Sequence, residues 1–221
     1  MSEQTLETKE RILKAAGDIF GQKGFKDTTI RAIAEQAKVN IAAINYHFRD
    51  KEALYGMVLE DVFRAGFTRF PVRLDKEIAA KPEEQLHAFI RAMFYRLQSK
   101  EGWGGFSGKG KLIARELLDP SPALEPILEK YIKPHKDLLV SIIADIMQVE
   151  HDPQKLMPCA ISIIGQCIYY ALASRIIRKI SAGDALDLDD LDRLADFVYH
   201  FSLGGIARVR EESIMNTSEE S

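Results

Sequence analysis

Asn45, Tyr46 and His47 occupy consecutive positions of the short stretch IAAINYHF, which contains no acidic residue. Their amide, phenol and imidazole groups donate and accept hydrogen bonds. On an exposed helix face such groups are suited to contacts with phosphate oxygens and base edges, and a solvated face without any acid is unusual. The pattern therefore indicates noncovalent recognition of a polar partner.

The segments around these residues predict two short helices joined by a tight turn. Residues 29–37 and 41–47 have apolar side chains at helical spacing, and residues 38–40 interrupt the pattern. Thr29 is placed to cap the first helix and Asp50 to cap a third. The expected inward stripe of the second helix is Ile41, Ile44 and Phe48. This arrangement is the one that carries a recognition helix into the DNA major groove.

Nine side chains are candidates for contact with DNA. They are Thr29, Arg31, Asn40, Ala42, Ala43, Asn45, Tyr46, His47 and Lys51. Arg31 is expected to reach a guanine edge or a phosphate, and the two alanines to touch a thymine methyl group. Tyr46, His47 and Lys51 are expected to position the protein on phosphates.

The run TTIRAIAEQAKVNIAAINYHFRDKEALY, preceded by RILKAAGDIFGQKGF, resembles the N-terminal region of the TetR family of transcriptional regulators. In that family the recognition helix ends in aromatic-Tyr-His-Phe, and a lysine starts the fourth helix. Tyr46, His47, Phe48 and Lys51 fill these positions, whereas Asn45 stands where an aromatic residue is commoner. The resemblance implies an all-helical homodimer that represses transcription and releases DNA when a small molecule binds.

A second resemblance lies in LIARELLDPSPALEPILEKYIKPHKDLL and extends over residues 82–205. It is similar to the C-terminal region of a CecR-like branch of the family, which includes the cephalosporin- and chloramphenicol-linked regulators of drug-export genes. The matching residues are Arg115, Glu116, Pro120, Ser121, Pro122, Pro134 and His135. The motif identifies no ligand.

The rest of the chain also predicts helices, which gives an all-α fold. Helices are expected over 7–23, 51–70, 82–100, 111–118, 153–179 and 188–210, and one or two over 123–148, because Pro134 lies inside that segment. We expect an N-terminal three-helix helix-turn-helix domain (1–52), a larger C-terminal ligand-binding and dimerisation domain (53–212), and a disordered tail (213–221). Five glycines in residues 102–110 indicate a flexible or tightly turned connector.

Composition places the chain in a reducing cytoplasm. Its 221 residues, 46% hydrophobic, suffice for a buried core, and the polar N-terminus does not resemble a signal peptide. The most apolar run, residues 159–177, is interrupted by Ser162, Gln166 and Ser174, so we expect a buried helix and no membrane partner. Cys159 and Cys167 lie eight residues apart in that run and are expected to be reduced.

The net charge of −3 excludes DNA binding through a general basic field. Residues 1–51 contain nine Lys and Arg side chains against seven Asp and Glu, a net charge of +2, which leaves −5 for the remainder. Affinity must therefore come from a few positioned donors, doubled in a dimer.

The last two helices contain more apolar positions than one inward stripe needs. We expect them to form a four-helix interface with a second copy of the chain, although burial in a single core is the alternative. The interface candidates are Ile161, Gly165, Ile168, Leu172, Leu194, Phe197, Val198 and Phe201.

A small hydrophobic or aromatic effector is the third expected partner, beside an operator in double-stranded DNA and a second copy. Its cavity would mix aromatic surface with polar groups. The candidate lining residues are Phe94, Trp103, Phe106, Arg115, Glu116, His135, Gln166, Tyr169 and Tyr170.

An enzyme is disfavoured, and no catalytic residue, metal or cofactor is expected. The five histidines are scattered and never show HxxxH spacing, and GWGGFSGKG lacks the Lys-Ser/Thr that ends a nucleotide-binding loop. Two alternatives remain open: a dimeric helical scaffold, and a small-molecule-binding protein without specific DNA binding. Salt-dependent retention on DNA would separate them from a regulator.

Overall fold

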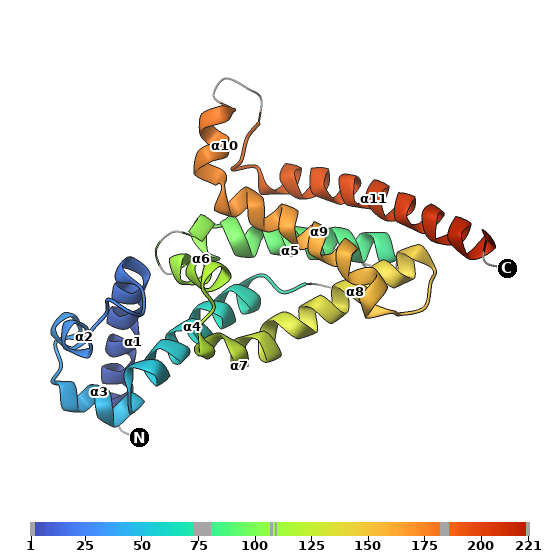
Figure 1. Cartoon of the computed structure of the whole chain (residues 1–221). Coiled ribbons are helices and arrows are strands. Elements are labelled where there is room, and N and C mark those ends of the chain that lie inside the picture. The colour runs from blue at the N-terminus through green and yellow to red at the C-terminus, as the bar shows by residue number, and fades with distance from the viewer. Residues whose placement is uncertain (1–2, 73–80, 107, 109, 182–185, 220–221) are drawn as a thin grey trace.

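The computed structural model describes residues 3–72, 81–106, 108, 110–181 and 186–219, and all regular secondary structure in these residues is helical. Three helices, α1 (Glu3–Lys23), α2 (Ile30–Ala37) and α3 (Ile41–Phe48), form a small N-terminal unit, the reading head (Figure 1). Helix α4 (Lys51–Arg69) leads from it into the larger helical body. The all-α fold with an N-terminal helix-turn-helix is confirmed.

A small apolar core holds the reading head together. Ile12, Ile33, Ile44 and Phe48 are buried in it, and they come from all three of its helices. Thr29 caps α2 by accepting a hydrogen bond from the backbone N–H of Ala32, as the sequence predicts. Asp50 caps α4 in the same way, through the N–H of Ala53.

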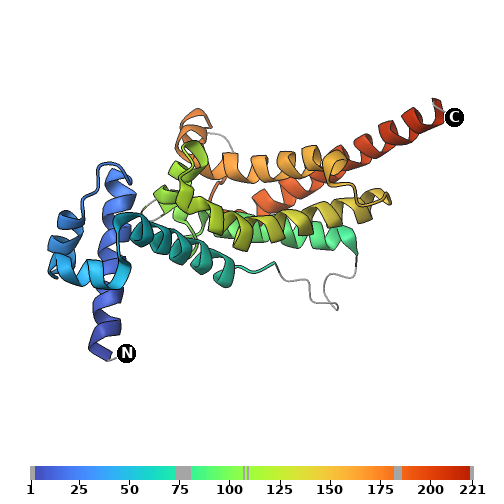
Figure 2. The same cartoon turned by 60° about the horizontal axis from the view of Figure 1, so that its bottom comes forward.

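Helix α5 (Pro82–Gln98) is the central helix of the body. It packs against α8 (Lys133–Met147), α9 (Pro153–Leu172) and α11 (Leu191–Glu219). Helix α6 (Gly110–Leu118) lies between this bundle and the reading head and contacts α1 and α4. Figures 1 and 2 both show the C-terminal part of α11 extending past the end of the bundle.

The segment around Pro134 is neither one regular helix nor two separate ones. A short 3-10 turn, η2 (Pro122–Leu124), and α7 (Glu125–Ile127) run into a π-helical turn, η3 (Leu128–Ile132), which continues into α8. Pro134 stands in the first turn of α8, where it cannot donate to the helix and would clash with the carbonyl of an α-helical turn before it. The wider π turn accommodates it without ending the helix.

Two other boundaries differ from the sequence prediction. The expected helix over 153–179 bends at Ala173, where α9 ends and α10 (Ser174–Ile180) begins. Helix α11 continues through Glu219, so the tail expected to be disordered from residue 213 is helical over its described part. A continuous helix without a proline or glycine stop explains the second difference.

Helix α9 contains the larger part of the most apolar run of the sequence. By length and hydropathy it is the one described helix that could cross a membrane. Its packing against α5, α8 and α11 is that of a helix in a folded bundle.

Candidate functional site

The outer face of α3 is open and polar. Tyr46 is 80% exposed, Asn45 is exposed and His47 is half-buried, with the Tyr46 and His47 rings 5.2 Å apart. Ile44 and Phe48 point into the core as predicted. The prediction for Ile41 is wrong, because its side chain is 44% exposed at the first position of the helix. The face that α3 presents to solvent therefore includes apolar as well as polar groups.

Asn40, a candidate for contact with DNA, also caps α3. Its Oδ1 accepts a hydrogen bond from the N–H of Ala43 at 2.7 Å and so caps α3. Only its amide NH2 group stays available to an acceptor on DNA. The Thr29 oxygen is likewise used as a cap, which leaves its hydroxyl proton to donate.

Lys51 and Arg31 differ in how freely they can reach DNA. The Lys51 ammonium donates to the carbonyls of Phe25 and Thr28, at 3.0 and 3.1 Å, and lies 4.3 Å from the Phe25 ring centroid. One of its three protons is left for a phosphate. Arg31 makes one exposed ion pair with Glu35, at 3.1 Å, and such pairs exchange readily for other partners.

Two exposed cations that were not predicted flank α3. Lys38 in the turn before it and Arg49 just after it both have positive φ angles, 54° and 64°. The Arg11 guanidinium secures this turn by donating to the carbonyls of Ala37 and Lys38, at 2.8 and 3.0 Å. Nothing in the sequence indicates this backbone, because the left-handed region normally favours glycine. The charges of Lys38 and Arg49 lie beside the exposed face of α3.

A mostly apolar cavity of about 260 Å³ lies in the body. Its lining side chains come from α4, α5, the connector, α6, the segment 124–136 and α9. They are Phe63, Phe67, Phe89, Met93, Leu97, Trp103, Ile113, Glu116, Leu117, Leu124, Leu128, Ile132, His135, Lys136, Ile164 and Ile168. The volume is close to the lower end of the roughly 300–1,000 Å³ typical of small-molecule sites.

Three of the predicted ligand residues, Trp103, Glu116 and His135, line this cavity. Five other predicted residues lie outside it. These are Phe94, Arg115, Gln166, Tyr169 and Tyr170. Phe94 is fully buried in the core, Tyr169 is exposed, and Arg115 reaches away to the carbonyl of Gln22. The side chain of Phe106 lies outside the described residues.

Trp103 is fixed by close backbone contacts around the glycine-rich connector. Its indole N–H donates to the carbonyl of Val62 at 3.1 Å. A Cβ at Gly66 would lie 2.5 Å from the indole nitrogen, and one at Gly110 would lie 2.0 Å from the Trp103 carbonyl oxygen. The connector is therefore tightly turned in its described part and holds an aromatic wall of the cavity.

Glu116 forms a fully hydrogen-bonded junction at the cavity wall. One carboxylate oxygen accepts from the Tyr55 hydroxyl at 2.7 Å, and the other accepts from the backbone N–H and hydroxyl of Ser121, at 2.9 and 3.0 Å. Burial and this carboxylate raise the pKa of Tyr55, so its phenol stays a donor. The Tyr55 ring in turn packs against Phe20 and Phe25 of the reading head.

Comparison with known proteins assigns both halves of the chain. Residues 12–58 match the model of bacterial regulatory proteins of the tetR family. Residues 82–206 match the C-terminal domain of the HTH-type transcriptional dual regulator CecR, over more than half of the chain. The chain belongs to the TetR family. It is a helix-turn-helix transcriptional regulator, and the family is one of regulators and not of enzymes.

Individual relatives agree with this assignment. The chain is 28% identical over 191 residues to the dual regulator CecR of Shigella flexneri, which covers 82% of this chain and 83% of that protein. It is 27% identical over 139 residues to the probable regulator YttP of Bacillus subtilis, covering 62% of this chain and 64% of that protein. The crystal structure of HlyIIR, a hemolysin II transcriptional regulator, shares the fold with a TM-score of 0.59 at 24% identity, covering 87% of this chain and 97% of that one.

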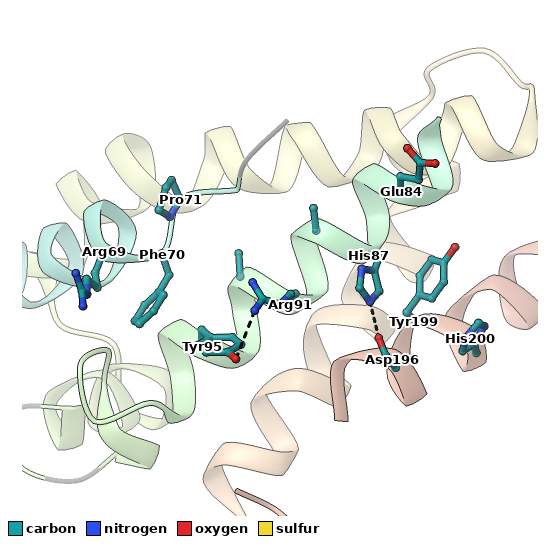
Figure 3. Close-up of a pocket in the computed structure, with 12 residues that line it drawn as sticks. Arg69, Phe70, Pro71, Glu84, His87, Arg91, Tyr95, Asp196, Tyr199 and His200 are labelled. Carbon is teal, nitrogen blue, oxygen red and sulfur yellow. Dashed lines mark hydrogen bonds and ion pairs between the residues drawn. The ribbon is translucent and has the colours of Figure 1, made fainter. Parts of the chain in front are cut away.

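This TetR-family chain has a second, wider hollow, an open groove of about 820 Å³ between the end of α4 and helices α5 and α11 (Figure 3). Several of its charged groups are already in ion pairs, and Arg69 is paired with Glu101. His87 lies 2.6 Å from Asp196, and Arg91 lies 2.7 Å from Asp192, whose pKa is lowered by that hydrogen bond. A wide groove lined by ion pairs offers less to an apolar small molecule than the mostly apolar cavity does.

The outer side of α9 and α11 is apolar and uncovered. Of the predicted interface residues, five are exposed on it: Ile161, Gly165, Leu172, Phe197 and Phe201. The other three face their own chain, because Leu194 and Val198 are buried in the core and Ile168 lines the cavity. The prediction of an interface role for these three is therefore wrong.

Proposed function

We propose that the protein represses transcription in the cytoplasm by binding a pseudo-palindromic operator as a homodimer, and that a small apolar molecule in the cavity releases it. One observation supports this above the others: the outer face of α3 carries Asn45, Tyr46 and His47 on a rigidly capped helix without an acid. Exposed Lys38 and Arg49 on its two sides add charge for the phosphates.

The uncovered apolar face supports pairing with a second copy. Phe197 and Phe201, 60% and 64% exposed, stack on each other along α11, and Ile161 of α9 is 61% exposed. A Cβ added at Gly165 or Gly204 would meet nothing within 4 Å in the described part of the chain, so a partner helix has room to approach. A self-complementary face gives a two-fold dimer, and two reading heads then meet an inverted repeat.

Helix α6 supplies a physical link between the cavity and the reading head. Glu116 lines the cavity and holds Tyr55 of α4. Its neighbour Arg115 donates to the carbonyl of Gln22, at 3.2 Å, and its guanidinium packs against Gly24. A ligand that displaces α6 therefore moves α1 and α4 together. A coupling of about 1–3 kcal/mol, usual for allostery, changes DNA affinity about 5- to 150-fold.

Footprinting on the DNA upstream of the gene tests the operator. We expect protection of an inverted repeat by the wild-type chain. Phe201→Glu, which places a charge on the apolar face, should give monomers in light scattering and lose the footprint at the same protein concentration. Leu118→Glu is the matched control, because Leu118 is also exposed but lies on α6. A scaffold or a simple small-molecule binder would protect no repeat at any salt concentration.

A further inference from the structure

Arg96, on α5, is a buried cation with an unusual set of partners. Its side chain is 0% exposed. The Nε–H donates to the carbonyl of Phe70 at 2.7 Å, Nη2 lies 3.3 Å from Nε2 of His135, and Nη1 has no hydrogen-bond partner among the described residues. Burial lowers the pKa of Arg96 to about 10, so it remains charged at neutral pH.

No carboxylate among the described residues pairs with this guanidinium. Its other neighbours are neutral: the Phe67 ring lies 4.3 Å away, and His135 places its Nδ1 2.8 Å from the carbonyl of Tyr131. Nδ1 is therefore assigned as the donor, which leaves the Nε2 lone pair facing Arg96. Burial and the charge of Arg96 both lower the pKa of His135, which keeps the ring neutral. A buried charge without a counter-ion is costly, and an anion would offset that cost.

The position of Arg96 connects this guanidinium, which has no carboxylate partner among the described residues, with the cavity. Phe67 and His135, which the guanidinium contacts, both line the cavity wall. Lys136, next to His135, lines it too, but its ammonium is paired with the Asp137 carboxylate. The one carboxylate among the lining residues belongs to Glu116, and its oxygens are already occupied by three donors. The cavity thus has apolar walls, with the Arg96 charge directly behind Phe67 and His135.

We infer that the effector is an amphipathic carboxylate, with a compact apolar body in the cavity and its carboxylate on Arg96. This inference rests on the proposed function and names the chemical class of its ligand. The carboxylate accepts hydrogen bonds from Nη1–H and, in place of His135, from Nη2–H, which suits the two-pronged geometry of a guanidinium. His135 turns aside to admit it, because this ring lies between the cavity and the cation behind it.

Matched probes of equal shape test the charge requirement. We would titrate the protein with 2-naphthoate and 2-naphthamide, and with octanoate and octanamide, by calorimetry. We expect each carboxylate to bind about 10- to 100-fold more tightly than its amide, the difference usual for a hydrogen-bonded charge. Arg96→Met should abolish this preference and Arg96→Lys should keep part of it. Arg91→Met, which removes an exposed arginine of the same helix, should leave it unchanged.

Two results would overturn the inference: no carboxylate binding to the wild-type chain from either pair, or a preference for carboxylates that survives Arg96→Met in a variant with wild-type circular dichroism. Operator release is measured separately with the same probes. Carboxylates that bind through Arg96 but do not release DNA would contradict induction and leave the anion site standing. Neutral amides that release DNA where carboxylates do not would contradict the anion site and leave induction standing.

Discussion

Two buried charges flank the cavity, and they differ in how fully they are hydrogen-bonded. Glu116 is 4% exposed and accepts three hydrogen bonds from Tyr55 and Ser121. Arg96 is 0% exposed and has one strong acceptor, one long contact to His135 and one nitrogen with no partner in the part of the chain that the structure describes. A satisfied buried charge stabilises the packing around it, whereas an unsatisfied one costs free energy until a partner arrives.

The difference separates a structural junction from a binding group. Glu116 fastens α6 to α4 and to the turn before η2, so its role is complete in the protein alone. Arg96 fastens only the end of α4, through Phe70, and keeps capacity for an acceptor. Substitutions at the two positions should therefore have unequal effects on stability.

The largest effect is expected for Glu116→Leu. It leaves the buried Tyr55 hydroxyl and both donors of the half-buried Ser121 without their acceptor, and should lower the free energy of unfolding by about 3 kcal/mol. Urea denaturation followed by circular dichroism measures this loss. Glu125→Leu, at an exposed glutamate of the neighbouring α7, should change stability by less than about 0.5 kcal/mol. Equal stability of the two variants would mean that Glu116 contributes no more to stability than an exposed glutamate does.

A smaller loss, about 1–2 kcal/mol, is expected for Tyr55→Phe, because one hydrogen bond to a charged acceptor is removed and the ring packing is kept. In the Glu116→Leu background the same substitution should cost almost nothing, since its acceptor is gone. A double-mutant cycle of urea unfolding gives the coupling energy. Additive losses would mean that the 2.7 Å contact contributes nothing to stability.

Arg96→Met should change stability by less than about 1 kcal/mol or increase it, since an apolar side chain replaces an unpaired buried charge. The comparison with Glu116→Leu is direct, because both substitutions remove a buried charge beside one cavity. Thermal unfolding without ligand is the measurement. A loss as large as that of Glu116→Leu would show that Arg96 is a structural junction too.

The smallest effect concerns pH. The pKa of His135 is lowered from 6.5 by burial and by Arg96, so the unfolded chain takes up a proton at a higher pH than the folded one. His135 therefore contributes a loss of stability as pH falls through 6.5, and the loss grows until the folded pKa is reached. His135→Gln should show a shallower fall in melting temperature between pH 7.5 and 5.5. A slope identical to wild type would mean that His135 does not titrate differently on folding.

Local chemistry made the reading head predictable. Thr29 and Asp50 cap helices wherever their short oxygen-bearing side chains precede an apolar repeat, and both positions are confirmed. Ile44 and Phe48 are buried for the same reason of periodicity. The positive φ angles of Lys38 and Arg49 were not predictable from residue preference, and at Lys38 the backbone is held by the tertiary contacts of Arg11.

The body was less predictable because its helices are apolar on more than one side. Periodicity identifies apolar stripes on a helix but not which stripe faces the core. Phe197 and Val198 were therefore equally good candidates for an interface. The structure exposes the first and buries the second. The burial of Arg96 could not be predicted from the sequence, because an arginine in an amphipathic helix is normally solvated. Only the tertiary fold shows that this side chain is buried.

The apolar face of α9 and α11 follows the reading head along the chain, so it is synthesised later. Translation delivers α1 to α4 first and α11 last, and domains of a growing chain fold in that order. The reading head can therefore complete its core on the ribosome before the apolar face of α9 and α11 has been synthesised. Neighbouring nascent chains on one messenger RNA therefore carry folded reading heads before they carry this apolar surface.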